Sequence, residues 1–375
     1  MTATTRKGGL ALKVFTEVAQ LAELEADWER LIKQLPAPSP FISPRWIIPW
    51  LEVYGPEGEI LVLAAYRKNE LAGLCPLILR QGKFLRLPAR LLEFAGSPLS
   101  DRMDMIIPER KEEVVELFWD YLWEVRSRWD VVRLGEIPAG SFNLTVTGDL
   151  LRDRKIRHTF RTCSICPFIL LDQDWEAYLQ SRSKQFRKRV RGDLKRIKRA
   201  GEVRLQEAKV ADWKLFREIS LDSPKARRGT SLFLRPGIDR FLPVFLEKFE
   251  EAGWLNCKLL TLDGEPIAYK LNFKFQNKIW LFNSSFRSSY GSLHPGYVIM
   301  ALLIQDSIKN SFREMDYLRG AEPFKYHYTN EIRYHREIIV FNRAFRPDLL
   351  RALFAVKTAL KRLLGKETRL PGKGI

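Results

Sequence analysis

The sequence predicts an α/β protein with mixed sheets, built from two halves that share one order of elements. Pairs of apolar strands joined by short polar turns occur twice along the 375 residues, each followed by a helix and a further strand. The composition, 46% apolar and 29% charged, is that of a globular chain long enough for two ordinary hydrophobic cores. We therefore expect two similar domains.

The first half contains a complete α/β unit after a loose tail at residues 1–10. Residues 19–34 predict an amphipathic helix, because apolar side chains recur on one face, and the proline-rich segment LPAPSPFISP ends it. The segment ILVLAAYRKNELAGLCPLIL predicts two strands joined by a polar turn at residues 68–70. A helix at about 111–127 and the strand VVRLGEIP complete the unit.

The second half repeats this plan. The segment LNCKLLTLDGEPIAYKLNF predicts two strands joined through Asp263 and Gly264, a dipeptide favoured in two-residue hairpins. The strand KIWLFNSSF, a helix at about 295–310 and the strand EMDYLRGAEP follow. This last strand aligns with WDVVRLGEIP of the first half, which indicates a duplication.

Two segments carry most of the net charge of +18. Residues 182–199 hold ten Lys or Arg against Asp193, a net of +9, and residues 346–375 have a net of +6. The first segment predicts a helix that docks through an apolar stripe, has a basic outer face and stops at Gly201. The stripe consists of Phe186, Val190, Leu194 and Ile197.

Residues 346–375 predict a C-terminal amphipathic helix and tail. The apolar stripe of this helix consists of Leu349, Leu353, Val356, Leu360 and Leu363, beside Arg351, Lys357, Lys361 and Arg362. Such a helix can lie on an anionic membrane surface. It can equally dock on the first domain, with basic side chains covering apolar surface, and both interpretations stay open.

The segment FNSSFRSSYGSLHPGYVIM leads from a strand into a helix and could bind an anion. Pro295 suits the first helical turn, and Gly291 and Gly296 would let a ligand approach backbone amides at the positive end of the helix dipole. A pyrophosphate would fit there. Because GxGxxG and GxxxxGK[ST] are absent, an ordinary loop with a proline-started helix is the alternative.

A polar segment, MDYLRGAEPFKYHYTNE, follows an apolar strand at the position where α/β proteins keep their sites. It holds Asp316, Arg319, Glu322, Lys325 and Tyr326. A carboxylate such as Glu322 could take a proton from an attacking amine, and a tyrosine could protonate a leaving thiolate. The alternative is a solvated loop with an internal ion pair.

Missing motifs exclude several kinds of protein. The sequence has no run of about 18 uncharged apolar residues and no signal-peptide core, so we expect a cytoplasmic protein. Cys163 and Cys166 lack a second CxxC and the four histidines lack ligand spacing, so we expect no metal site. Without GxSxG, HExxH or a Walker loop, direct transfer in a ternary complex is favoured over a covalent intermediate.

Residues from about 166 to 343 resemble the GNAT-type acyltransferase domain of FemAB-like and CelD-like (cellulose-biosynthesis) proteins. The resemblance rests on CPFILLDQDWEAYL, SRSKQFRKRVRGDLKRIKRAG, GEPIAYKLNF, HPGYVIM and MDYLRGAEPFKYHY. Gly320, Glu322 and Lys325 fill the final motif of that family, whereas His294 stands where relatives have a small residue.

The resemblance implies two tandem GNAT-like domains packed together. Residues 11–165 would form the wall on the acceptor side, residues 166–345 the acyltransferase domain, and residues 346–375 a basic amphipathic helix and tail. The co-substrate would be an acyl-CoA, with acetyl-CoA as the first choice, and no metal would be needed.

The residues expected at the site form three sets. Position and chemistry suggest Glu322 as the base and Lys325 as the group that polarises the acyl carbonyl or holds the acceptor. The full catalytic set is Glu322, Lys325, Tyr326 and Asp316. The carrier is expected to contact Gly291, His294, Gly296, Tyr297, Lys184, Arg187 and Lys188. The acceptor is expected to contact Asp101, Asp104, Arg319 and Tyr269.

The predicted function is acyl transfer from acyl-CoA to an amine or hydroxyl of a small-molecule or glycan-precursor acceptor, used for the cell envelope or an exopolysaccharide. Relatives of the FemAB branch use aminoacyl-tRNA, so a tRNA-dependent peptidyl transferase is one alternative. A non-catalytic module that binds nucleic acid or another anionic surface is a second. Peripheral contact with the inner membrane through residues 346–375 is compatible with the cytoplasmic location.

Overall fold

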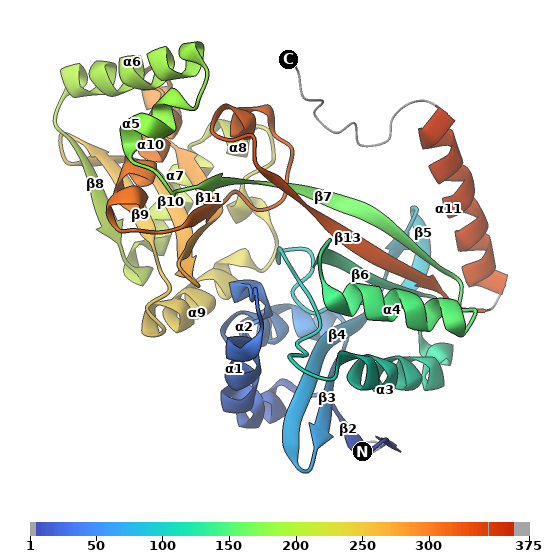
Figure 1. Ribbon diagram of the computed structural model, residues 1–375. Helices are drawn as coiled ribbons and strands as arrows, with labels where there is room; N and C mark the ends of the chain where they lie inside the picture. The colour runs from blue at the N-terminus through green and yellow to red at the C-terminus, as the bar shows by residue number, and fades with distance from the viewer. Residues whose placement is uncertain (1–4, 344, 364–375) are drawn as a thin grey trace.

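The computed structural model describes the backbone of residues 5–343 and 345–363 and the side chains of residues 7–343 and 347–360. In this part of the chain, thirteen strands form one sheet in the order β1-β2-β3-β4-β5-β6-β13-β7-β12-β11-β10-β9-β8. Figure 1 shows two halves side by side, joined by the long strands β7 and β13. No helix of the described residues combines the length and the apolar character that crossing a bilayer requires.

The elements follow the chain in two series. The first half consists of β1 (Thr5–Lys7), β2 (Leu10–Phe15), α1 (Glu25–Gln34), α2 (Pro44–Tyr54), β3 (Glu59–Arg67), β4 (Glu70–Phe84), β5 (Leu87–Phe94), α3 (Lys111–Glu124), β6 (Val131–Pro138), α4 (Phe142–Asp153) and β7 (His158–Leu170). The second half consists of α5 (Trp175–Gln180), α6 (Lys184–Ala200), β8 (Val203–Ala208), α7 (Trp213–Leu221), α8 (Pro224–Arg227), α9 (Ile238–Glu251), β9 (Cys257–Leu262), β10 (Glu265–Phe275), β11 (Lys278–Phe286), α10 (Pro295–Lys309), β12 (Glu314–Asp316), β13 (Ile332–Phe341) and α11 (Phe345–Leu363).

Apart from β1, the strands follow the same order and directions from both edges of the sheet. The series β2 to β6 and β8 to β12 have the same order, and in each series only the last pair, β5 with β6 or β11 with β12, is parallel. The two central strands are exchanged, because β7 pairs with β12 and β13 pairs with β6. The tandem arrangement expected from the sequence is confirmed, and the expected domain limit after residue 165 falls inside β7.

The two predicted hairpins have the same turn. Lys68 and Asn69 (φ 48° and 69°) join β3 to β4, and Asp263 and Gly264 (φ 50° and 85°) join β9 to β10. Positive φ at both central residues is the type I′ geometry, whose twist matches that of the flanking strands. Local turn chemistry therefore fixes the register of both hairpins.

Several elements are absent from the sequence-based prediction. They include β1, which lies in the expected tail, as well as β2, α2, β5, α4, β8, α7, α8, α9 and β13. Helix α2 begins at Pro44, the last residue of the proline-rich segment, because the first turn of a helix needs no amide donor. Helix α4 begins where the hydroxyl of Ser141 accepts from the Leu144 amide, an N-cap that the sequence analysis overlooked.

Aromatic side chains from the two halves share one core. Trp46 of α2 lies beside Phe41 and against Phe241 and Phe245 of α9, with ring centroids 4.9, 5.0 and 4.8 Å away. The indole Nε1 of Trp46 donates to Ser100 Oγ at 2.7 Å. This contact fixes the loop after β5 against the second half, where the candidate site lies.

A buried carboxylate joins the exchanged strands. Glu337 of β13 has no exposed surface, and it accepts from Arg133 Nε of β6 at 2.9 Å and from Arg161 of β7. The side chains of the two arginines stay 42% and 43% exposed, so water partly solvates their charges.

We expect Glu337→Gln to lower the free energy of unfolding by about 2 kcal/mol, because two cations lose a buried partner while keeping some hydration. Urea unfolding followed by tryptophan fluorescence measures this difference. The matched control is Glu202→Gln, which breaks an exposed pair with Arg204 and should cost about 0.5 kcal/mol or less. Equal losses in the two variants would contradict a special role for Glu337.

Candidate active site

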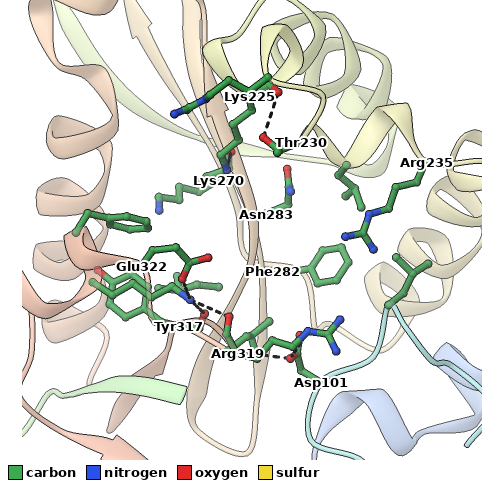
Figure 2. A pocket seen from close by; sticks show the side chains of 18 residues that line it. Asp101, Lys225, Thr230, Arg235, Lys270, Phe282, Asn283, Tyr317, Arg319 and Glu322 are labelled. Atoms are coloured by element: carbon green, nitrogen blue, oxygen red, sulfur yellow. Dashed lines mark hydrogen bonds and ion pairs between the residues drawn. The ribbon is translucent and has the colours of Figure 1, made fainter. Parts of the chain in front are cut away.

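A cavity opens where β11 and β12 separate. These parallel strands pair only between residues 278–280 and 314–316, and they diverge beyond them. The space between them is part of a cavity of about 650 Å³, closed by residues of α8, by the 3-10 helix η6 (Leu232–Leu234) and by the loop after β5. Figure 2 shows Tyr317 and Glu322 on one wall and Asp101 at the base.

The cavity is strongly basic. Its charged lining residues are Lys225, Arg228, Arg235, Lys270, Arg319, Lys325, Asp101 and Glu322. Both carboxylates are in ion pairs, Asp101 with Arg319 at 3.3 Å and Glu322 with Lys325 at 2.9 Å. Within the described residues the other four cations have no carboxylate partner, so the cavity favours an anionic ligand.

Lys325 holds the chain segment that follows β12. Its Nζ is buried and donates to the carbonyl oxygens of Tyr317, Arg319 and Gly320 at 3.2, 2.9 and 3.3 Å. Gly320 has φ 120°, and a Cβ there would lie 2.3 Å from Glu322 Oε2, so only glycine fits. The pair Lys325 and Glu322 therefore shapes this wall of the cavity.

Asp101 brings the first half into the site. Its partner Arg319 also lies 3.3 Å from Glu136 of β6, whose second oxygen is 3.1 Å from His335 Nδ1 of β13. Burial raises the pKa of Asp101 to about 6, although the positive charge of Arg319 acts in the opposite direction. One wall of the cavity thus carries a carboxyl group that titrates close to neutral pH.

Lys270 of β10 is a buried lysine on the cavity wall. Burial lowers the pKa of Lys270 to about 7, and the charges of Lys225 and Lys325 act in the same direction. Its strand neighbour Tyr269 lies behind the wall, stacked on Phe216.

A row of tyrosine rings runs from the cavity to the start of α10. Tyr317 lines the cavity, Tyr328 lies 5.9 Å from it, and Tyr297 lies 6.1 Å beyond. The hydroxyl of Tyr317 is buried with no hydrogen-bond partner in the described part of the chain. Burial raises the pKa of Tyr317 well above its usual value, so this hydroxyl stays protonated and has a free hydrogen-bond donor.

Helix α6 covers the start of α10. His294, in the left-handed region at φ 52°, places its Nδ1 2.9 Å from Asp193, the one acidic residue of α6. Arg189 lies 4.4 Å over the ring of Tyr297. A Cβ at Gly296 would meet only the Phe286 ring at 3.7 Å, so the protein leaves room there.

The structure brings the predicted site residues into two groups. Glu322, Lys325, Arg319 and Asp101 line the cavity together. The second group lies at the start of α10 and consists of Gly291, His294, Gly296 and Tyr297. Lys184, Arg187 and Lys188 lie in the first turns of α6, whereas the α6 residues that contact this region are Arg189, Asp193 and Arg196. Arg187 already donates to the carbonyl oxygens of Gln180 and Arg182.

Four further predicted residues belong to neither group. Asp316 accepts from the Leu318 amide and pairs with Arg333, which stabilises the end of β12. The Tyr326 hydroxyl is buried without a partner among the described residues. Tyr269 donates to Asn283, and Asp104 accepts from Ser141 and Asn143 beside α4.

Sequence reasoning missed several residues of the cavity wall. They are Lys225, Arg228, Arg235, Lys270, Asn283 and Tyr317. Two signals were present: a lysine inside the apolar strand IAYKLNF, and the basic run PKARR. Neither signal predicts a site until the strand order places both segments at the same opening.

Comparison with known proteins agrees with this geometry. Residues 184–326 match the family described as Acetyltransferase (GNAT) domain, and no curated protein sequence matches the chain. FemX is 13% identical, with a TM-score of 0.60 over 85% of this chain and 96% of that one. L-PGS from Bacillus licheniformis is 12% identical, with a TM-score of 0.54 over 92% and 97%.

A tandem GNAT protein from the clavulanic acid biosynthesis pathway is 10% identical, with a TM-score of 0.50 over 88% of this chain and 98% of that one. At such identities the structural likeness establishes the fold, and the sequence match establishes the domain type. Residues 184–326 thus form an acetyltransferase (GNAT) domain, and the chain as a whole has a tandem fold similar to that of FemX.

Proposed function

We propose that the protein transfers an acyl group from acyl-CoA to an amine of an anionic acceptor. The observation that carries this proposal is the cavity between the diverging strands β11 and β12. A row of tyrosine rings connects one end of this cavity to the start of α10. A thioester held in that gap would present its carbonyl carbon to an acceptor on the side of Asp101. Direct attack then needs no covalent enzyme intermediate.

The start of α10 is the proposed site for the phosphates of CoA. The helix N-terminus is an electropositive end, and Arg189 and Arg196 of α6, which contact Tyr297 and His294, add positive charge next to it. Gly296 leaves its surroundings open to a ligand. His294, where relatives have a small residue, is held aside by Asp193, so its size need not block the approach.

The basic lining supports an acceptor that carries a phosphate or a carboxylate. Lys225, Arg228 and Arg235 line the cavity and have no carboxylate partner in the described residues. A phosphorylated glycan precursor, as used for cell-envelope or exopolysaccharide synthesis, has both the amine and the negative charge. Asp101 would then orient the acceptor amine.

The pair Glu322 and Lys325 is proposed to orient the reacting groups. Lys325 Nζ already bonds three carbonyl oxygens, so its main effect on the acyl carbonyl is a fixed positive charge behind the wall. The Tyr317 hydroxyl, which has no partner in the described residues, is proposed to donate a hydrogen bond to the leaving sulfur. Asp316 and Tyr326 stay outside the cavity and have no role in this proposal.

Acetyl-CoA at about one hundred times its Kd should raise the melting temperature by several degrees, because a ligand that binds only the folded state adds about 2.7 kcal/mol of stability at that ratio. In Gly296→Val the fold has space for the new side chain. The bound carrier would clash with this side chain, so the shift in melting temperature should vanish. Differential scanning fluorimetry with acetyl-CoA and longer acyl-CoAs measures both results.

Gly140→Val is the matched control, since a Cβ at Gly140 meets nothing within 4 Å and the residue lies far along the chain from α10. It should keep the full shift. If aminoacyl-tRNA stabilises the protein and no acyl-CoA does, the donor is aminoacyl-tRNA. If neither does so while plain tRNA binds, the protein is a nucleic-acid module.

Helix α11 supports a second proposal, contact with an anionic membrane surface. Leu350 and Phe354 are buried against Phe84 and Phe341, so the helix is docked on the first half. The opposite side is nevertheless apolar and open to solvent, through Leu349, Leu353, Val356 and Leu360 at 47, 41, 58 and 52% exposure. The side chain of Leu363, expected in the same stripe, lies outside the described residues.

Replacing both Leu349 and Leu353 by serine should lower binding to vesicles that contain anionic lipid by about 30-fold, because each lost leucine removes roughly 1 kcal/mol of burial in the bilayer interface. Co-sedimentation with phosphatidylglycerol vesicles measures it. Leu234→Ser, at a leucine that is 50% exposed in η6, is the control. Equal binding by all three proteins would remove the membrane proposal.

A further inference from the structure

Lys270 is a cation in an apolar strand. Its sequence neighbours Tyr269 and Leu271 have no exposed surface, and Lys270 itself is 7% exposed. Burying an ammonium group without a partner is costly, so such a residue is retained only where it has a use. The part of Lys270 that is not covered by protein lies on the cavity wall.

Every charged neighbour of Lys270 already has partners. Lys225 Nζ of α8 donates to the Ser284 carbonyl at 2.7 Å, and Lys325 is held by three carbonyls and Glu322. Lys258, its register neighbour on β9, is paired with Glu207 and with Asp306 of α10. Lys270 is the exception, because no hydrogen bond or ion pair to its Nζ exists within the described residues.

The two carboxylates of the cavity are also engaged. Asp101 lies against Arg319, and Glu322 Oε2 lies against Lys325 Nζ. Either carboxylate could therefore accept a proton only in competition with the cation that it already pairs with. The Lys270 amine faces no such competitor, and the two nearby cations favour its neutral form, with a free lone pair.

From this arrangement we infer that Lys270 is the catalytic base, which takes a proton from the acceptor amine at the cavity wall. This inference rests on the proposed acyl transfer and adds the proton acceptor to it. The sequence-based expectation gave that role to Glu322, which here orients the reacting groups through its pair with Lys325.

The reaction balances with an acyl thioester as donor. The acceptor ammonium gives one proton to the neutral Nζ of Lys270, and the freed nitrogen lone pair attacks the thioester carbonyl carbon. A C–N bond forms, the C–S bond breaks, and its electron pair leaves with sulfur. The sulfur takes the second proton of the attacking nitrogen, and Lys270 releases its proton to water before the next turnover.

The activity test uses acetyl-CoA as donor, glucosamine 6-phosphate as a probe acceptor with an amine and a phosphate, and thiol release as the signal. In the wild type, kcat/KM should fall about tenfold per pH unit below pH 7, where Lys270 becomes protonated. Lys270→Met should lower the plateau rate by about 100-fold and remove this pH dependence.

The Lys270→Arg variant distinguishes a catalytic base from a cation that only binds an anion. Lys270→Arg cannot lose its proton, so we expect it to be as slow as the methionine variant. Lys274→Met, at an exposed position on the same strand, should behave as the wild type. A Lys270→Arg enzyme with at least a third of normal kcat/KM would overturn the inference, as would loss of the pH dependence in Glu322→Gln alone.

Two measurements need no turnover, so they test Lys270 even if the proposed function fails. Brief labelling of the folded chain with acetic anhydride, read by mass spectrometry, should modify Lys270 with a midpoint near pH 7, with the exposed Lys274 as the reference position. A Lys270 midpoint above pH 9 would refute the inference. An absence of thiol release, with a midpoint near pH 7, would count against the acceptor or donor class instead.

The second measurement is thermal stability. Below pH 7 Lys270 is charged in both the folded and the unfolded chain, so the full cost of its burial is present, and this cost disappears as pH rises through the unfolded value of 10.5. Lys270→Met should therefore raise the melting temperature by several degrees at pH 6.5 and by much less at pH 11. Equal shifts at the two pH values would contradict a buried, unpaired amine.

Discussion

The pairing of β7 with β13 is the contact on which the rest of the molecule depends. Each half-sheet is completed by a strand from the other half, β13 beside β6 and β7 beside β12. Glu337 supports this exchange from inside the sheet, and Trp46 joins the helices of the two halves. Because neither half holds a complete sheet by itself, a cavity with walls from both halves exists only in the joined fold.

The divergence of β11 and β12 creates the cavity and also leaves backbone carbonyl groups without strand partners. Lysine side chains supply the missing donors, since Lys225 bonds the Ser284 carbonyl and Lys325 bonds three carbonyls after β12. The same groups that complete the backbone hydrogen bonds thus make the cavity basic. Lys270, between them, has no such structural task, which is why its amine remains available for chemistry.

Much of the fold could be predicted from the sequence, because hairpin turns, the basic helix and the repeated order of elements are local patterns. The strand exchange could not, since it joins segments more than 150 residues apart. In the site, Glu322 and Lys325 were found because they follow a strand end. Lys270 was missed because its burial depends on the strand order. The sequence could not show that Asp101 lines the cavity whereas Asp104 does not, because this depends on the turn of the loop at Arg102, which has φ 54°.

The corresponding strand pair of the first half, β5 and β6, is closed. Beyond the residues where β5 and β6 pair, the Met103 amide donates to the Glu136 carbonyl at 2.9 Å, while Leu99 and Asp101 reach into the other half's cavity. The strand pair of the second half stays open and forms the cavity, and the first half contributes a loop to the wall of that cavity. Under the proposed function, acceptor preference would depend on a loop outside residues 184–326, so proteins that share the whole acetyltransferase domain need not acylate the same molecule.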